Sequence, residues 1–345
     1  MRAVRLNSWK SEPVVVDVPN PEPGPGEVVI KVGGAGLCHT DLHFMHDFEA
    51  GSVPFEPPFT LGHENAGWVH ELGAGVQGWD IGQPVAVSGP WGCGRCGRCR
   101  RSEENLCENV TSLGALGGGS GRDGGMAEYL LVPSDRLLIP LNGLDPVAAA
   151  PLTDAGVTPY RAVKRSLPLL VPGSTAVVIG AGGLGHLAVQ ILKRLTPAHV
   201  VVLDRNPKAL ALATSVGADS CVLVDDNVGV ALLDATAGRG AEVVIDFVGS
   251  DSTMALAATT ARAAGHITLA GIAGGTFPFG FLGSALEVAF ASSHWGSTTE
   301  LLEVIRLAEQ GHLEVHRETV SMDEVITTYA RLAAGEVIGR AVLVP

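Results

Sequence analysis

The segment that decides the fold is STAVVIGAGGLGHLAVQILKRL, residues 174–195. Its first part, TAVVI, is the short apolar run of a buried strand, and AGGLGHLAVQILKRL has the apolar spacing of an amphipathic helix. The glycines at the junction fit the pattern G-x-G-x-x-G: the first permits a tight turn, the second lets the backbone approach a pyrophosphate, and the third allows close helix packing. The segment therefore predicts a dinucleotide site; the alternative is a structural turn without a ligand. The candidate contacts are Gly180, Gly182, Gly183, Leu184 and Gly185.

An acidic residue follows this unit at the distance that a dinucleotide site requires. The next apolar run, HVVVLD, ends on Asp204, nineteen residues after Gly185. A carboxylate at that position accepts hydrogen bonds from the adenosine ribose and repels a 2′-phosphate, so the sequence favours NAD over NADP. Arg205 stands beside it and could pair with such a phosphate. Residual use of NADP therefore stays open.

The rest of the chain divides into two kinds of pattern. From about Thr175 onward, apolar runs such as SCVLVD, AEVVIDFVG and GHITLAGI alternate with helical stretches such as NPKALALATSVG. This alternation predicts a doubly wound parallel sheet. Residues 1 to about 150 have short apolar runs, such as VVIKV at 28–32, separated by Gly and Pro. That pattern is typical of a mainly β unit with long loops.

Four cysteines lie within fifteen residues, with the spacing C-x2-C-x2-C-x7-C. Four thiolates at this spacing can hold one tetrahedral zinc ion and leave it no open position, so the cluster predicts a structural zinc site. The alternative, two disulfides in a secreted domain, is disfavoured because a chain of 345 residues has only six cysteines, and Cys38 and Cys221 stand alone. The predicted ligands are Cys93, Cys96, Cys99 and Cys107.

Composition narrows the class of partner. The chain has 36 acidic and 23 basic residues, a formal net charge of −13, and no Lys/Arg-rich run. This balance disfavours nucleic acid and anionic membranes as partners. The N-terminus lacks the apolar region of a signal peptide, and no long apolar stretch occurs. We therefore expect a soluble cytoplasmic protein.

Five motifs in a fixed order carry a resemblance to a known family. They are GLCHTDLH (36–43), GHENAG (62–67), the four-cysteine lobe (91–110), PLTDAGVTPY (151–160) and GAGGLG (180–185). Together they resemble the zinc-dependent medium-chain alcohol dehydrogenases across essentially the whole chain, in particular the bacterial NAD-dependent secondary-alcohol type. The resemblance implies a mainly β GroES-like catalytic domain over residues 1–153 and 296–345, and a Rossmann NAD-binding domain over 154–295.

The resemblance also implies a second zinc ion, held by Cys38, His63 and Asp154. Asp154 stands where many relatives have a second cysteine; as a carboxylate it is an ordinary zinc ligand and balances the charge equally well. Taken alone, it would equally suit a helix cap. Glu64 resembles the family's carboxylate that can approach the metal, and Asp41 is expected to orient the imidazole of His63.

The implied reaction is reversible hydride transfer between an alcohol, expected to be secondary, and NAD, giving a ketone or aldehyde and NADH (EC 1.1.1.-, with 1.1.1.1 as the expected number). The alcohol would react as a zinc-bound alkoxide, because zinc lowers the pKa of a bound hydroxyl. Thr40 and His43 resemble the family's proton relay. For His43 the alternative is a surface histidine in a polar loop.

Further roles follow from the same resemblance. His39 and Arg340 correspond to pyrophosphate contacts, and Thr158 to the hydroxyl beneath the nicotinamide. Val248 and Ile272 end strands near the expected ring position, where apolar residues would also be core. Trp91 and Trp295 are candidates for the wall of the substrate pocket or for packing.

Several alternatives stay open at this point. A polyol or amino-alcohol dehydrogenase of the same superfamily would share every motif and differ only in its pocket. A non-catalytic nucleotide-binding protein on the same fold is the non-enzyme alternative. The family also implies a homodimer or homotetramer, and the apolar segment GGTFPFGFLGSALEVAF (274–290) is a candidate for pairing between subunits.

Overall fold

The computed structural model describes residues 1–277, 280–281 and 284–345, which form two compact units. The first unit contains Met1–Val157, Trp295–Gly311 and Arg317–Pro345. The second unit contains Thr158–His294 and His312–His316. Residues 154–157, Trp295 and the short segment His312–His316 thus belong to units other than those of the expected division.

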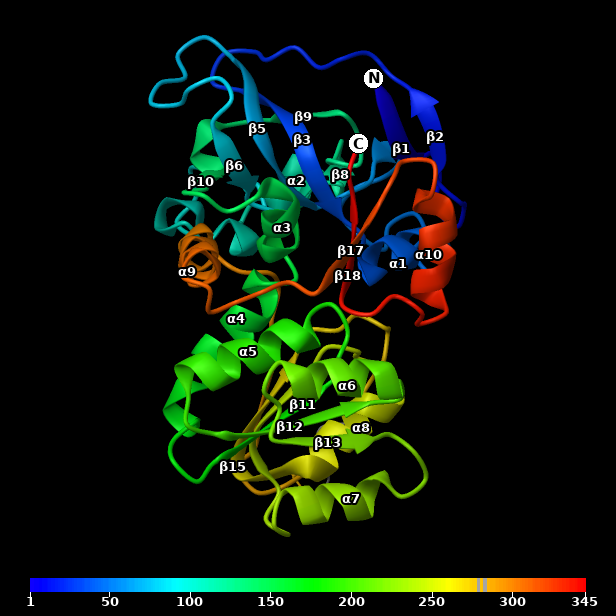
Figure 1. Cartoon of the computed structure of the whole chain (residues 1–345), viewed down its shortest axis with the longest axis vertical. Coiled ribbons are helices and arrows are strands. Elements are labelled where there is room, and N and C mark those ends of the chain that lie inside the picture. Colours follow the sequence, from blue (N-terminus) through cyan, green and yellow to red (C-terminus); the bar gives the residue numbers. More distant parts are fainter. Residues whose placement is uncertain (278–279, 282–283) are drawn as a thin grey trace. The chain divides into compact units, whose positions relative to one another are not determined.

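The second unit contains a six-stranded sheet in which every neighbouring pair of strands is parallel (Figure 1). The strands are β11 (Thr175–Ile179), β12 (His199–Asp204), β13 (Ser220–Leu223), β14 (Ala241–Asp246), β15 (Ala261–Leu269) and β16 (Ala289–Ser292). Their spatial order is β13-β12-β11-β14-β15-β16, which is the order of a Rossmann sheet. From β11 the chain adds strands β12 and β13 on one side and then β14, β15 and β16 on the other. Folds of this kind bind ligands at the point between β11 and β14 where the strand order reverses. The predicted doubly wound α/β fold is confirmed.

Helices α5 to α8 alternate with these strands along the chain. The helices of this unit are α4 (Val157–Ser166), α5 (Gly185–Leu195), α6 (Pro207–Ser215), α7 (Val228–Ala235) and α8 (Asp251–Thr260). Helix α6 begins where Asn206 accepts a hydrogen bond from the Lys208 amide, followed by a proline in the first turn. Apolar side chains of the strands and of α7 and α8 form one buried cluster, so the sheet is covered as its continuous apolar runs predict.

The first unit is built around a seven-stranded sheet. Six strands follow the order β10-β6-β5-β3-β18-β17, and β9 also pairs with β3. They are β3 (Val28–Gly36), β5 (Glu64–Leu72), β6 (Pro84–Val87), β9 (Tyr129–Val132), β10 (Leu138–Pro140), β17 (Arg317–Val320) and β18 (Arg340–Leu343). Two smaller sheets complete the unit: β2 (Val14–Asp17), β1 (Arg2–Leu6) and β4 (Phe59–Thr60), and the pair β7 (Gly117–Gly118) and β8 (Gly121–Arg122). The predicted mainly β first unit is confirmed.

The first unit also contains five α-helices in its described residues. They are α1 (His39–His46), α2 (Val110–Leu113), α3 (Pro146–Ala149), α9 (Thr298–Glu309) and α10 (Val325–Ala333). Ser297 and Glu300 form a capping box at the start of α9. Helix α1 begins directly after Cys38, in a stretch where the sequence motifs predicted no helix. His43 therefore lies on a helix.

An aromatic cluster packs against helix α1. Trp9 contacts four phenylalanine rings at centroid distances of 5.9 to 6.3 Å. These rings, Phe44, Phe48, Phe55 and Phe59, belong to the apolar cluster of the first unit or pack against it. Phe48 of this cluster also stacks on the ring of His43, with the ring centroids 6.4 Å apart.

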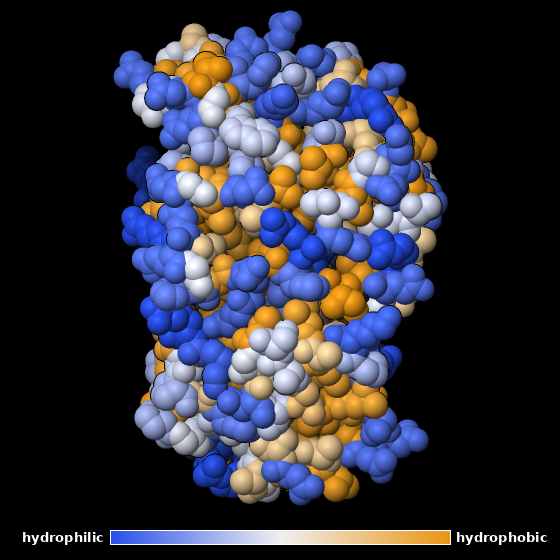
Figure 2. Space-filling view, viewed as in Figure 1, coloured by the Kyte–Doolittle hydropathy of each residue, from blue (hydrophilic) through white to orange (hydrophobic). Residues whose placement is uncertain are grey.

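The outer surface combines polar and apolar side chains. On the face drawn in Figure 2, hydrophilic residues alternate with smaller apolar areas. Among the described residues, no helix has both the length and the apolar character needed to cross a bilayer. Within the candidate pairing segment 274–290, residues 278–279 and 282–283 lie outside the described part of the chain. Its last two residues, Ala289 and Phe290, begin β16, which is the edge strand of the Rossmann sheet.

Candidate metal and nucleotide sites

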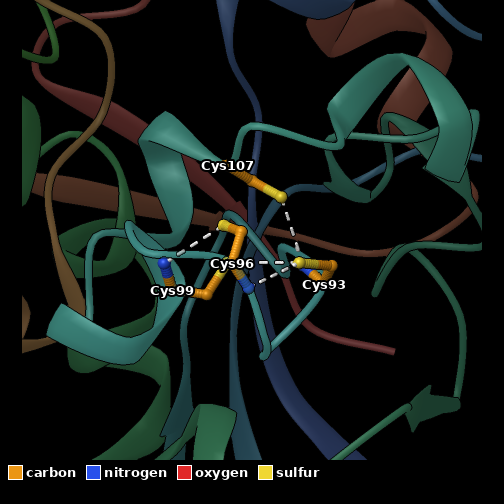
Figure 3. A group of neighbouring side chains, drawn as sticks. All are labelled: Cys93, Cys96, Cys99 and Cys107. Atoms are coloured by element: carbon orange, nitrogen blue, oxygen red, sulfur yellow. Dashed lines mark hydrogen bonds between the residues drawn. The ribbon is translucent and has the colours of Figure 1, made fainter.

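The four cysteines of the lobe converge on one point (Figure 3). Their sulfur atoms all lie within 4.8 Å of one another, and the Sγ atoms of Cys93 and Cys99 are 3.9 Å apart. Four sulfurs at tetrahedral Zn–S distances of about 2.3 Å would be separated by about 3.8 Å. The lobe therefore has the dimensions of a zinc site.

Backbone and side-chain amides point at these sulfurs. The amides of Cys93, Cys96 and Cys99 donate to sulfur atoms of the cluster at 3.3 to 3.4 Å, and Asn109 Nδ2 donates to Cys93 Sγ at 3.2 Å. Hydrogen bonds from Asn109 and nearby backbone amides lower the pKa of Cys93 to about 5. Burial instead raises the pKa of Cys99 to about 12. A hydrogen bond from the Cys99 amide also lowers the pKa of Cys96. The lobe thus favours two thiolates by itself, and a bound cation would stabilise the others.

An ion pair between Arg136 and the buried Glu104 fixes the base of the lobe. Arg136 donates to Glu104 Oε1 at 2.6 Å and to the Trp91 carbonyl at 2.6 Å. Thr298, in the first turn of α9, donates to the other Glu104 oxygen at 3.1 Å. The Trp91 indole donates to the Ser88 carbonyl at 3.0 Å. Trp91 is accordingly held within the core of the first unit.

A second group of possible ligands comes from three separate segments of the first unit. Cys38 precedes α1, His63 precedes β5, and Asp154 follows the 3-10 helix Ala150–Thr153. Asp154 Oδ2 lies 3.9 Å from Cys38 Sγ and 3.6 Å from His63 Nε2. Together with Glu64, one potential ligand atom of each residue lies within 4.8 Å of all the others. The three residues predicted from the resemblance are thus brought together.

The surroundings of His63 favour positive charge. Burial opposes protonation, but Asp41 and Asp154 together raise the pKa of His63 well above its usual value. Asp41 Oδ1 lies 3.4 Å from His63 Nδ1, as expected for a residue that orients the imidazole. The Trp295 ring meets the His63 ring edge-on at 5.7 Å. A soft thiolate, an imidazole and a carboxylate that together favour a cation form a donor set suited to zinc.

Glu64 is engaged in an ion pair that the sequence did not reveal. Arg340 Nε donates to Glu64 Oε2 at 2.9 Å, Arg340 Nη2 donates to Oε1, and both side chains are buried. Burial raises the pKa of Glu64 to about 7, against the opposing effect of Arg340. Arg340 Nη2 also lies 3.9 Å from Asp154 Oδ2. The residue expected at a pyrophosphate therefore contacts the metal group within its own unit.

Helix α1 presents the relay candidates. Thr40 Oγ1 lies 3.5 Å from Cys38 Sγ, beside the metal group. His43 Nδ1 lies 2.5 Å from Asp47 Oδ2, and the imidazole is 17% exposed. His39 is exposed in the first turn of the same helix. Asp47 was not anticipated, although its spacing four residues after His43 on a helix is a signal that could have identified it.

The glycine-rich turn of the second unit has the geometry that its pattern predicts. Gly180 has a φ of +93°, which favours glycine. A Cβ on Gly185 would lie 1.9 Å from the Gly180 carbonyl oxygen, whereas a Cβ on Gly182 would meet no atom within 4 Å. Asp204 accepts a hydrogen bond from the Ala181 amide at 2.7 Å and so ties the turn to the end of β12. The chain itself therefore requires Gly180 and Gly185 and leaves open space at Gly182.

The remaining candidates lie in different environments. Val248 follows β14 and lies next to Gly180, and Thr158 is buried near the start of α4. Ile272 and Arg205 are exposed. Trp295, although bulky and buried, has a φ of +48° in the left-handed region, a conformation that costs energy for such a residue.

Comparison with known proteins agrees with this architecture. Residues 24–143 match the family "Alcohol dehydrogenase GroES-like domain", and residues 183–310 match "Zinc-binding dehydrogenase". An NAD-dependent alcohol dehydrogenase of Sulfurisphaera tokodaii is 36% identical over the whole of both chains. D-arabinose 1-dehydrogenase (NADP(+)) of Saccharolobus solfataricus is also 36% identical, over 97% of this chain and 95% of its own.

A solved structure extends the likeness to three dimensions. The alcohol dehydrogenase of Aeropyrum pernix is 38% identical to this chain, and the match covers the full length of both chains with a TM-score of 0.93. The matched zinc-binding dehydrogenase family, the NAD-dependent relative and the two groups of possible metal ligands support zinc and NAD as cofactors. The chain therefore belongs to the zinc-dependent medium-chain alcohol dehydrogenase family.

Proposed function

We propose that this alcohol dehydrogenase interconverts secondary alcohols and ketones with NAD, at a zinc ion held by Cys38, His63 and Asp154. The observation that carries the proposal is the convergence of these three side chains, of which Cys38 and His63 are buried, with one potential ligand atom of each within 4.8 Å of the others. Three protein ligands leave a fourth tetrahedral position for a substrate, unlike the four-cysteine lobe. The preference for secondary alcohols rests on the resemblance of Asp154 and its PLTDAG context to bacterial ketone-handling relatives.

Some residues of the proposed zinc site balance the charge of the ion, and others orient its ligands. When bound, zinc lowers the pKa of a substrate hydroxyl and NAD accepts hydride. The Cys38 thiolate and the Asp154 carboxylate balance the charge of the ion, and Asp41 orients the His63 ring. Trp295 packs against the same ring and shields it from water. Both Glu64 oxygens are bonded to Arg340, so Glu64 could approach the ion only if that pair opened.

For the proton we propose a relay through Thr40 and His43. Thr40 Oγ1 lies beside the metal group, where it can accept a hydrogen bond from the substrate hydroxyl and pass its own proton on as it takes up the substrate's. The Asp47 carboxylate can only accept a hydrogen bond, so His43 Nδ1 carries hydrogen and leaves Nε2 free to take up a proton. The partial exposure of His43 lets it pass that proton to solvent.

The relay predicts a specific loss in one variant. His43→Ala should lower the rate of alcohol oxidation and shift its pH profile, because the route to solvent is interrupted. His46→Ala, which removes an exposed histidine three residues later on the same helix, is the matched control and should leave both unchanged. An unaltered pH profile in His43→Ala would remove His43 from the relay.

A sugar is the second candidate substrate, favoured by the D-arabinose dehydrogenase among the relatives. Initial rates of NADH formation with primary alcohols, secondary alcohols, polyols and aldoses separate the two candidates, and NADP in place of NAD tests the role of Arg205. We expect the highest kcat/KM with a secondary alcohol and NAD. A higher value with D-arabinose or a polyol would reverse the assignment.

We also propose a homodimer formed through the outer edge of β16. Among the described residues this strand ends the Rossmann sheet, and it exposes Ala289, Phe290 and Ser292. A sheet edge with an exposed apolar side chain is a ready surface for a strand of a second copy. Gel filtration should give a dimer or tetramer, and replacing Phe290 with Lys should weaken it; a wild-type monomer would contradict the proposal.

A further inference from the structure

Asp41 is the meeting point of three groups in the first unit. Its side chain has no exposed surface, and its Oδ2 atom accepts hydrogen bonds from the Cys38 amide at 3.0 Å and from the Tyr329 hydroxyl at 2.8 Å. Its other oxygen, Oδ1, lies 3.4 Å from His63 Nδ1. One carboxylate thus contacts the backbone of one candidate zinc ligand and the ring of another.

Tyr329 reaches this carboxylate from the far end of the chain. It lies on α10, 288 residues after Asp41, and is only 2% exposed. Its ring belongs to the apolar core of the unit, and its hydroxyl also lies 3.1 Å from Met126 Sδ. Burial and the negative charge of Asp41 raise the pKa of Tyr329 well above its usual value, so the hydroxyl keeps its proton and acts as a donor.

We propose that Tyr329 is a positioning residue of the zinc site, which fixes the Asp41 carboxylate so that Asp41 holds Cys38 and His63 in ligand geometry. The inference rests on the proposed zinc set of Cys38, His63 and Asp154. Neither the comparisons nor the sequence motifs assign a role to Tyr329, since no local pattern links it to the site.

The physical argument concerns the freedom of the carboxylate. Burying a carboxylate costs free energy unless hydrogen bonds compensate, and for Asp41 the two donors on Oδ2 supply that compensation and fix its rotation. Without the tyrosine hydroxyl, one fixed donor remains, and Oδ1 can turn away from His63. Loss of a hydrogen-bond partner of a ligand commonly lowers metal affinity 10- to 100-fold. Tyr329 acts through Asp41 instead of directly, so we expect an effect of about tenfold, at the lower end of that range.

The test uses Tyr329→Phe in the full-length, zinc-loaded enzyme. Zinc release to an excess of a chromogenic chelator is followed over time, and the ion in the four-cysteine lobe serves as an internal reference. We expect the more labile zinc ion to leave about ten times faster than from wild type. We also expect cobalt(II), loaded at the same site, to show shifted visible absorption bands.

Leu332→Ala is the matched control, because Leu332 is buried in the same core on the same helix and does not bond to Asp41. It should lower the unfolding temperature but leave zinc release and the cobalt spectrum unchanged. Equal acceleration of zinc release in Tyr329→Phe and Leu332→Ala would mean that Tyr329 acts only through stability, and unchanged release in Tyr329→Phe would likewise overturn the inference.

A double-variant cycle with Asp41 gives an independent answer. In an Asp41→Asn background, Tyr329→Phe should accelerate zinc release no further, because the two side chains act in series. Full additivity of the two effects would overturn the inference. Cys38→Ala separates this outcome from failure of the proposed function: if that variant retains both zinc ions, the proposed zinc set is wrong, whatever Tyr329 does.

Discussion

At the scale of single residues, the buried pair of Glu64 and Arg340 is the most sensitive point of the first unit. Arg340→Met would leave Glu64 as a buried carboxylate whose remaining bond is to the Ala155 amide. Breaking one side of a buried ion pair typically costs about 3–5 kcal/mol, so we expect a loss of that size in the free energy of unfolding. Denaturant titration followed by tryptophan fluorescence measures it, because all five tryptophans lie in the first unit.

The matched control for this prediction is the double variant Glu64→Gln/Arg340→Met. It removes both charges and should recover most of the lost stability, since no uncompensated charge remains. A loss of less than about 1 kcal/mol in Arg340→Met alone would mean that the pair behaves like an exposed salt bridge.

The environment of His266 leads us to expect that the stability of the second unit depends on pH. Burial, assisted by Arg165, lowers the pKa of this histidine, whose Nδ1 lies 3.0 Å from Ser166 Oγ. The unfolded chain therefore binds a proton more readily, so the contribution of His266 to stability is present above its ordinary pKa of 6.5 and is lost as the pH falls below it. In His266→Gln, unfolding free energies measured between pH 5 and 8 should lose this part of the pH dependence. Parallel curves for wild type and variant would contradict it.

These residue pairs also mark where sequence-based prediction stops. Cys38, His63 and Asp154 could be named because each stands in a local motif. The partners of the site could not, since Arg340 is 276 residues from Glu64 and Tyr329 is 288 residues from Asp41. Only the folded sheet and helix α10 bring them together.

At the scale of elements, different glycines of the turn between β11 and α5 are needed for folding and for NAD binding. Gly182→Ala meets no neighbouring atom and should fold with unchanged thermal stability, yet bind NAD more weakly, because the new methyl group occupies space that the pyrophosphate needs. Gly185→Ala would collide with the Gly180 carbonyl and should lower stability as well. Thermal unfolding and NAD titration by calorimetry measure both effects. Unchanged NAD affinity in Gly182→Ala would contradict the assigned role of that glycine.

Helices differ in how well their sequences announce them. The apolar residues of TELLEVIRLAEQG (299–311) recur at helical spacing and predict helix α9, and its capping box of Ser297 and Glu300 is visible in the sequence. Helix α1 was not predicted, because its N-cap residue is Cys38 and not one of the residues that usually cap helices, such as Ser, Thr, Asp or Asn. Asp41 in its first turn accepts a hydrogen bond from the Cys38 amide. The sequence motifs therefore gave no prediction for the element that carries the relay candidates.

At the scale of the whole molecule, the two units divide the cofactor chemistry. Both candidate zinc groups lie in the first unit, and the glycine-rich turn with Asp204 lies in the second. The fold class and both cofactors were predictable because each depends on a compact motif. The limits of the units were less predictable, since the chain returns to the first unit at Trp295, leaves it for His312–His316 and enters it again at Arg317.

This division predicts two zinc ions per chain, both of which stabilise the first unit. Metal analysis should give two ions in wild type and one in either Cys38→Ala or Cys107→Ser, because each variant removes a ligand from a different group. Bound zinc favours the folded state by mass action, so chelation should lower the unfolding temperature reported by tryptophan fluorescence. The second unit holds neither group, and its transition, followed by hydrogen exchange of β11 and β12, should shift less. One zinc ion in wild-type protein with full activity would show that the four-cysteine lobe is empty, whereas equal shifts in both units would show that they unfold as one.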